Sequence, residues 1–363
     1  MSKAAELAAF IANQSSANVA SKNIIINGNM AVAQRATSST STGYQTVDRF
    51  QMGTSGVDEG PTQAQVDVSS GTTPYTLGFK KALKITNGNQ TSGADAGDII
   101  DVKHGIEAQH IAQSGWDFKS ASSFVTLSFW VKSSVAQNFF GLVRTFDGTA
   151  FNFPFSTGSL TADTWTKVTK TIPGNSNLTI DTDNGEGLQI RWHMFLGTDR
   201  TASVTEDTWV AFDTTQRTPD NTSTWYTTND ATFEITGVQL EVGEVATPFK
   251  HESFGDNLKR CKRYFIRYSN SGNYAIGAAE DGTRGIFAFP APDMRAAPTG
   301  TQGTLTLGGG IGSPPAVTAI SSVTNSGHGL DLLLTVGSGL TAKDALRIRA
   351  TDTASFLAFD AEL

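Results

Sequence analysis

The side chains most often used for metal and thiol chemistry are few and widely spaced in this sequence. The histidines are His104, His110, His193, His251 and His328, and Cys261 is the only cysteine. None of the histidines has an HExxH or zinc-finger spacing, and one cysteine cannot form an intrachain disulfide. The sequence also lacks a GxSxG elbow and the glycine-rich loops that bind phosphate. We therefore expect a protein that is not an enzyme and that uses no metal and no cofactor.

The most acidic short segment is DTDNGEG, residues 181–187. Its carboxylates and Asn184 offer hard oxygen ligands, but the spacing only begins like an EF-hand loop and lacks the distant glutamate. Asp-Asn-Gly is also a strong hairpin signal. The pattern favours a turn, with a calcium site as the alternative. Glycoside hydrolysis needs two carboxylates at a set separation, and no local signature identifies such a pair.

Aromatic residues are the more informative candidates. Trp130 shares the polar face of its strand with Lys132 in VTLSFWVKSS, and Trp165 also alternates with polar residues. Trp225 and Tyr226 lie in the polar segment STWYTT, which we expect to be a loop. Exposed aromatic rings can stack on the apolar faces of sugars, so these four are candidate glycan-binding residues. The alternatives are rings that cover the second face of a sheet or lie in a subunit interface.

These candidates need a β-rich scaffold, and the sequence predicts one. Short alternating segments separated by Gly, Asn, Asp and Pro run from Asn23 to about Phe249, which favours a β-sandwich. In LQIRWHMFL, Trp192 alternates with apolar residues and is expected in the core. Ser253 and Asp256 form a capping-box-like pair that begins a short helix. Short strands follow the helix to the end of the chain.

The predicted fold is mainly β. It has a short N-terminal helix, a jelly-roll β-sandwich, a short connecting helix and a smaller C-terminal β domain. The expected boundaries are 1–22, 23–250, 251–268 and 269–363. Within the N-terminal helix, Leu7, Ala8 and Ile11 share one apolar stripe that needs a surface to cover it. A peg that docks on another protein and a helix folded back on its own domain both satisfy this need.

Composition narrows the class of protein further. Hydrophobic residues make up 38% and charged residues 17% of the chain, and the formal net charge is −7. This acidic balance argues against a nucleic-acid partner, which calls for clustered Lys and Arg. No apolar run approaches the length of a membrane span, so no membrane insertion is expected. The N-terminus lacks the features of a secretory signal, so synthesis in a cytoplasm is expected.

Several short segments of the sequence, taken in order, resemble segments of known protein families. NIIINGNMAVAQR, VDRF, TLSFWVKSS, TWTKVTKTI and GVQLEVGEVATPFKHESFGDNLKRCKRYF occur in this order within residues 23–268. In order and spacing they resemble tail-fibre and related virion proteins of tailed bacteriophages. The subset TLSFWVKSS, TWTKVTKTI and GVQLEVG also resembles the jelly-roll carbohydrate-binding modules found beside glycoside hydrolases.

The resemblance implies a homotrimeric tail fibre or receptor-binding protein of the virion, made in the host cytoplasm. It implies attachment to other phage proteins through residues 1–22, including Leu7, Ala8 and Ile11. It also implies recognition of a host cell-surface glycan, with the C-terminal domain as a possible distal receptor-binding part. A purely structural virion protein, such as a head fibre, decoration or tail-tip component, is the alternative. A polysaccharide depolymerase is a third interpretation.

Overall fold

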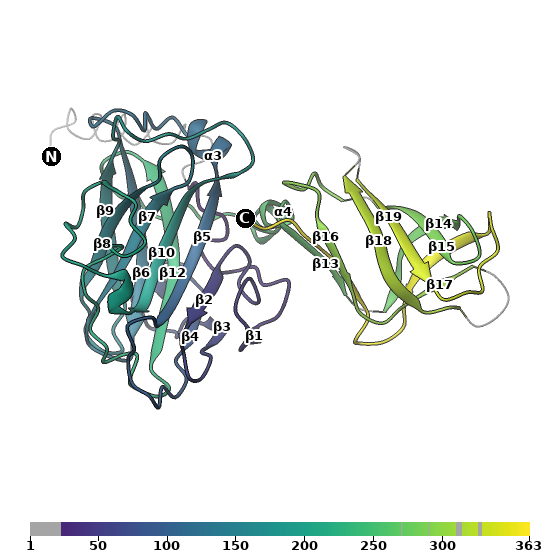
Figure 1. Ribbon diagram of the computed structural model, residues 1–363, viewed down its shortest axis with the longest axis horizontal. Helices are drawn as coiled ribbons and strands as arrows, with labels where there is room; N and C mark the ends of the chain where they lie inside the picture. The colour runs from purple at the N-terminus through teal and green to yellow at the C-terminus, as the bar shows by residue number, and fades with distance from the viewer. Residues whose placement is uncertain (1–22, 270, 290, 310–313, 326–328) are drawn as a thin grey trace.

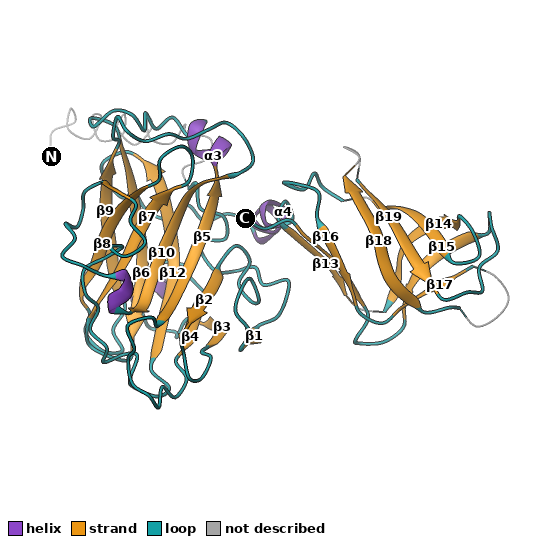
Figure 2. Ribbon diagram, viewed as in Figure 1, coloured by secondary structure: helices purple, strands orange, loops and turns teal. Residues whose placement is uncertain are grey.

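The computed structural model describes residues 23–269, 271–289, 291–309, 314–325 and 329–363. The expected N-terminal helix, with Leu7, Ala8 and Ile11, lies outside these described residues. Strands dominate both halves of the molecule, and the helices are short (Figure 2). The N-terminal half forms two stacked sheets, and the remaining strands lie beyond helix α4 (Figure 1). The expected mainly-β fold, a sandwich with a smaller β part, is confirmed.

Two antiparallel six-stranded sheets form the sandwich. Sheet A has the order β1 (Ser38–Ser39), β3 (Thr62–Asp67), β4 (Lys81–Thr86), β12 (Thr232–Val242), β6 (Phe124–Ser133), β9 (Thr166–Pro173). Sheet B has the order β11 (Val210–Ala211), β8 (Phe151–Ser159), β7 (Asn138–Thr145), β10 (Glu186–Leu196), β5 (Ile99–Glu107), β2 (Gln51–Ser55). Successive strands cross repeatedly between the sheets, as in a jelly roll.

Short helical turns interrupt the strands of the sandwich. They are α2 (Thr73–Thr76), α3 (Ala108–Ala112) and the 3₁₀ turn η1 (Thr198–Arg200). Helix α4 (Phe254–Cys261) follows the last sandwich strand, and the Ser253 side chain accepts a hydrogen bond from the Asp256 amide. The predicted N-cap of the connecting helix is therefore confirmed.

The C-terminal strands form two further sheets. A three-stranded sheet has the order β13 (Phe265–Ser269), β21 (Phe356–Asp360), β16 (Thr299–Gln302). A six-stranded sheet has the order β17 (Leu305–Gly308), β20 (Ala345–Ala350), β14 (Gly272–Ala279), β15 (Arg284–Phe289), β19 (Leu330–Val336), β18 (Val317–Asn325). Their apolar residues form a core separate from that of the sandwich. The expected domain boundaries stay a prediction.

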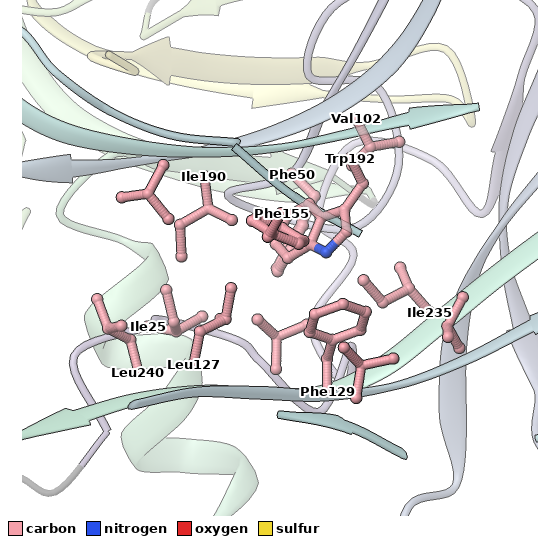
Figure 3. Close-up of a cluster of buried hydrophobic side chains, with 14 of the residues drawn as sticks. Ile25, Phe50, Val102, Leu127, Phe129, Phe155, Ile190, Trp192, Ile235 and Leu240 are labelled. Atoms are coloured by element: carbon pink, nitrogen blue, oxygen red, sulfur yellow. The ribbon is translucent and has the colours of Figure 1, made fainter. Parts of the chain in front are cut away.

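The sandwich core follows from strict alternation along the strands. Val125, Leu127, Phe129 and Val131 of β6 are all buried between the sheets, as their spacing predicts. Phe129 contacts Trp192 of β10 edge to face, with ring centroids 5.7 Å apart. Figure 3 shows these side chains facing one another from the two sheets. The same alternation must place every second residue of each strand on an outer face.

Polar contacts join the sandwich to the C-terminal part. Glu107, at the end of β5, accepts hydrogen bonds of 2.7 Å from the Arg263 Nε and Nη2 atoms, and a further bond from the Tyr264 hydroxyl. Arg49 pairs with Glu362, and its guanidinium lies 3.5 Å from the centre of the Tyr264 ring. Buried charges need such partners, so this junction holds the two parts together.

Candidate functional site

The outer face of sheet A carries two of the predicted glycan-stacking residues. Trp130 is half-buried and lies between Lys167 of β9 and Thr236 of β12 in the sheet register. Trp165 is also half-buried, and the Lys132 Nζ atom lies 5.3 Å from the centre of its ring. Lys132 in turn pairs with Glu234 at 3.0 Å. The structure therefore brings Trp130 and Trp165 onto one face, as predicted, but each ring is partly covered.

Much of the remaining outer face of sheet A is occupied by the chain itself. A bulge in β12 contains Gly237, whose φ of +64° suits glycine, and a Cβ there would meet the Phe79 ring at 2.7 Å. The segment after β12 also crosses this face, where Glu241 accepts bonds from Thr247 and Gln239 accepts one from the Lys250 amide. This face consequently presents little open surface for a ligand.

Trp225 and Tyr226 are buried, with exposed fractions of 0% and 1%. The Trp225 indole donates to the Thr232 carbonyl at 3.0 Å, and the Tyr226 hydroxyl donates to Asp98 at 2.8 Å. Tyr226 also stacks on Phe195, with ring centroids 4.4 Å apart. The segment is a polar turn, as expected, but the expectation that its two rings are exposed is wrong. As placed, neither ring can stack on a glycan, because each has its hydrogen-bonding group and its ring inside the fold.

The remaining sequence candidates are placed as follows. Leu7, Ala8 and Ile11 lie outside the described residues. In the segment 181–187, Asp183 accepts a bond from the Gly185 amide at 2.9 Å, and Asn184 contacts Arg295 of the C-terminal part. This segment forms a turn at the junction. Among the described residues, no group of three His, Cys, Asp or Glu side chains is arranged to hold a metal ion.

The outer face of sheet B is the site that the sequence did not identify. In β5 and β10 the core residues alternate with Asp101, Lys103, Arg191 and His193, which point to the opposite face. The register aligns Gln51, Lys103, Arg191 and Leu142 in one row across four strands. The adjacent row contains Gly53, Asp101, His193 and Phe140. Sheet pairing thus gathers polar side chains from distant parts of the chain.

One part of this outer face forms an open groove of about 240 Å³. The lining residues come from β2, β5 and β10: Gln51, Gly53, Thr54, Ser55, Ile99, Asp101, Lys103, Arg191. The Arg191 Nη1 atom lies 3.2 Å from the Asp101 carboxylate, and its Nε atom donates to Gln189. These contacts hold the guanidinium across the sheet, where a ligand could reach its remaining donors.

The segment 197–221 covers the neighbouring part of the same face. The Asp207 amide donates to the Pro154 carbonyl at 2.8 Å, and the Arg144 guanidinium lies 3.5 Å from the centre of the Phe212 ring. Arg217, from the same segment, donates to Thr214 through its Nε and Nη2 atoms. This segment therefore adds basic side chains beside the groove.

Several buried polar atoms of this face have no hydrogen-bond partner among the described residues. They are Gln51 Oε1, Arg144 Nε, both polar atoms of the Asn152 side chain, both ring nitrogens of His193, and Arg200 Nε. Asn152 and His193 are each 0% exposed. Buried polar atoms are normally satisfied, and such exceptions call for an explanation. Asn152 and His193 are as fully enclosed as Trp225 and Tyr226, so a ligand on the surface does not reach them, whereas Gln51 lines the groove.

The charges of this face are close enough to affect one another. Burial, with Arg191 and Arg200 nearby, lowers the pKa of Arg217 to about 10, so it remains a cation at pH 7. Burial also lowers the pKa of His193, and Arg191 adds to this effect, so the imidazole is neutral at pH 7. Burial raises the pKa of Asp101, against the opposing charge of Arg191. The site thus combines cationic donors with neutral hydrogen-bonding groups.

Comparison with known proteins gives weak structural likenesses. No protein-family model matches the sequence, and no curated protein matches it significantly. The enzymatically active domain of bacteriophage CBA120 tailspike protein 4 has 10% identity and a TM-score of 0.32 over 61% of this chain, which spans only 21% of that chain. Other solved structures with similar scores include carbohydrate-binding modules.

Two of these modules illustrate the match. The N-terminal cellulose-binding domain of Cellulomonas fimi β-1,4-glucanase C has 12% identity and a TM-score of 0.27, over 60% of this chain and 99% of that chain. The family 11 module of Clostridium thermocellum, solved with a mixed-linked tetrasaccharide, has 11% identity and a TM-score of 0.25, over 53% of this chain and 88% of that chain. At this level of overlap the likenesses carry no inference about a ligand or an activity.

Proposed function

We propose that this chain is a bacteriophage tail fibre or receptor-binding protein that recognises a host-surface polysaccharide without cleaving it. The binding surface is the outer face of sheet B. The sequence landmarks within residues 23–268 support the assignment to virion proteins. Assembly as a homotrimer and attachment through residues 1–22 are parts of the same proposal, as is a place on the phage tail after synthesis in the host cytoplasm.

The observation that carries the proposal is the polar groove of sheet B. A polysaccharide offers a row of hydroxyl groups, which both donate and accept hydrogen bonds. The groove is lined by Gln51, Ser55 and Arg191. An open groove on a rigid sheet that is lined by polar and charged side chains suits a chain of sugars better than a small apolar ligand.

A pair of matched tryptophan substitutions tests which face binds. Ser55→Trp places a bulky ring at the exposed rim of the groove on sheet B, and Thr169→Trp places the same ring on the outer face of sheet A. We expect fluorescently labelled wild-type protein and Thr169→Trp to bind host cells, and Ser55→Trp to lose binding. Loss of binding in Thr169→Trp alone would move the site to sheet A. Absence of binding by the wild type at micromolar concentration would favour the purely structural virion protein.

The attachment role has its own test. A chain that begins at residue 23 should fold and bind cells as the full chain does, but should fail to join virions assembled in a complementation experiment. Incorporation at the wild-type copy number would contradict attachment through residues 1–22. Sedimentation of both chains would measure the homotrimer directly.

A further inference from the structure

Basic residues are concentrated on the outer face of sheet B, although the chain as a whole is acidic. They are Lys103 of β5, Arg144 of β7, Arg191 of β10, Arg200 of η1 and Arg217 of the covering segment. Asp101 and Glu186 are the carboxylates on β5 and β10 whose charges act on Lys103, and the covering segment 197–221 also carries Asp199, Glu206, Asp207, Asp213 and Asp220. In the groove itself Lys103 and Arg191 face one carboxylate, Asp101, so the groove has a local positive charge opposite in sign to the net charge of the protein.

The chain does not neutralise this charge with its own ion pairs. Of these basic residues, Arg191 alone pairs with a carboxylate within the described part of the chain, namely Asp101 at 3.2 Å. Lys103 forms no ion pair there, and neither do Arg144, Arg200 and Arg217. Like charges placed together and partly buried repel one another and cost stability. Such an arrangement is expected where an anion from outside the chain supplies the missing charge.

We propose that the glycan bound on this face is anionic and that its carboxylate, sulfate or phosphate groups pair with Arg191, Lys103 and Arg217. The inference rests on the proposed function and specifies its ligand class. Guanidinium groups bind such oxoanions through paired hydrogen bonds. Lys103 lies beside Arg191 in the sheet register, so two cations face the groove together. Gln51, Thr54 and Ser55, which line the same groove, are then left to bind the uncharged parts of the sugar.

A glycan fits these observations better than a nucleic acid. The groove mixes charged donors with neutral polar side chains, namely Gln51, Thr54 and Ser55, which suit hydroxyl groups. Nucleic-acid sites generally rely on an extended basic surface, whereas this basic face belongs to a chain of net charge −7.

Matched ligands isolate the role of the negative charge. Binding is measured by isothermal titration with polygalacturonate and its fully methyl-esterified form, and with dextran sulfate and dextran. Within each pair the backbone is the same and the charge differs. We expect the charged member to bind at least about tenfold more tightly and to weaken as salt is raised. Preference for polygalacturonate or for dextran sulfate then distinguishes carboxylate from sulfate recognition. Duplex DNA serves as the polyanion control.

Variants that remove one positive charge show where on the protein the charged glycan binds. Arg191→Gln and Lys103→Gln should each weaken binding of the charged glycan by roughly tenfold and leave its neutral partner unaffected. Lys167→Gln, an exposed lysine on β9 of sheet A, makes the same change of charge away from the groove and should bind as the wild type does. Equal loss in Lys167→Gln would mean that only the overall charge of the protein matters.

The outcomes separate this inference from the function on which it rests. Equal binding of charged and neutral partners, or tighter binding of DNA, overturns the anionic ligand while leaving surface recognition intact. If no glycan in the panel binds, the binding of the protein to host cells tests whether a ligand is recognised at all. Cell binding that survives high salt and is unchanged in Arg191→Gln and Lys103→Gln also overturns the inference. A protein that binds neither glycans nor cells contradicts the proposed function itself.

Discussion

The Arg191 guanidinium lies 3.2 Å from the Asp101 carboxylate, on the outer face of sheet B. These residues belong to neighbouring strands, and 90 residues separate them in the sequence. The pair is the one place where this basic face carries its own counter-charge at contact distance among the described residues. Asp101 is therefore a competitor for any anionic ligand that reaches Arg191.

Removing this competitor should strengthen binding. We expect Asp101→Asn to tighten binding of polygalacturonate by roughly three- to tenfold, because Arg191 is freed from its partner and a like charge is removed from the groove. The contact between Arg191 Nε and Gln189 should keep the guanidinium in place. Titration calorimetry measures the change, with methyl-esterified pectin as the neutral control. Weaker binding of polygalacturonate would indicate that Asp101 itself contacts the sugar.

Tyr226 should matter for stability and not for recognition. Replacing it with phenylalanine removes the hydrogen bond to Asp98 and should lower the free energy of unfolding by about 0.5–1.5 kcal/mol. Tyr75→Phe is the control, because the Tyr75 hydroxyl makes no hydrogen bond within the described part of the chain and its ring is half-buried. Urea unfolding measures both variants. Loss of glycan binding by well-folded Tyr226→Phe would restore this residue as a ligand contact.

Trp130 is expected to have a scaffold role. Its ring is half-buried on the outer face of sheet A, so Trp130→Ala should cost on the order of 1–2 kcal/mol of stability, less than the loss of a fully buried side chain. Binding to host cells should be unchanged. A folded Trp130→Ala protein that no longer binds cells would show that the glycan stacks on Trp130, on the outer face of sheet A.

The junction between the two parts of the molecule should weaken in acid. Burial raises the pKa of Glu107, but hydrogen bonds from Arg263, Tyr264 and Gln109 outweigh it and hold the pKa at about 2, below the ordinary value of 4.5. A carboxyl whose pKa is lowered by folding stabilises the protein above its unfolded pKa. This contribution is present above pH 4.5 and is lost as the pH falls from there towards 2.

A difference measurement isolates this contribution from other titrating groups. Glu107→Gln should lower the free energy of unfolding by about 1.5–3 kcal/mol at pH 7, since bonds to a charged group are lost. The gap from the wild type should close as the pH approaches 2. Glu280→Gln disrupts the exposed pair with Arg284 and should cost less than about 1 kcal/mol. A gap that is independent of pH would contradict the assigned role of the Glu107 charge.

Local sequence was sufficient for the features that depend on local periodicity and capping. Alternation in β6 predicted that Val125, Leu127 and Phe129 are buried, because successive residues of a strand must face opposite sides. The same reasoning placed Trp192 in the core, where it contacts Phe129. The N-cap at Ser253 was predictable because its partner, Asp256, lies in the first turn of the same helix.

The candidate site depended on long-range structure, and there the sequence misled. The polar residues around Trp225 and Tyr226 suggested a solvated loop. The segment is such a turn, in which the exposed Thr227 and Thr228 donate their hydroxyls to backbone carbonyls, but both aromatic rings are buried inside the fold. The groove was missed because Asp101, Arg191 and Gln51 become neighbours only through sheet pairing. The sequence did contain a signal for the groove. In DVK (residues 101–103) and RWH (residues 191–193), charged or polar residues alternate with buried apolar residues.

The location of the ligand is tested most directly by chemical modification of arginine. Phenylglyoxal reacts with accessible guanidinium groups, and mass spectrometry reports the rate at each residue with and without the most tightly bound acidic oligosaccharide. Arg191 has 20% of its side chain exposed, and Arg284, in the C-terminal part, has 45% exposed and serves as the internal control. We predict that the oligosaccharide protects Arg191 and Arg217 and leaves Arg284 unchanged. Unaltered modification of Arg191 and Arg217 in the saturated complex would contradict binding on the outer face of sheet B.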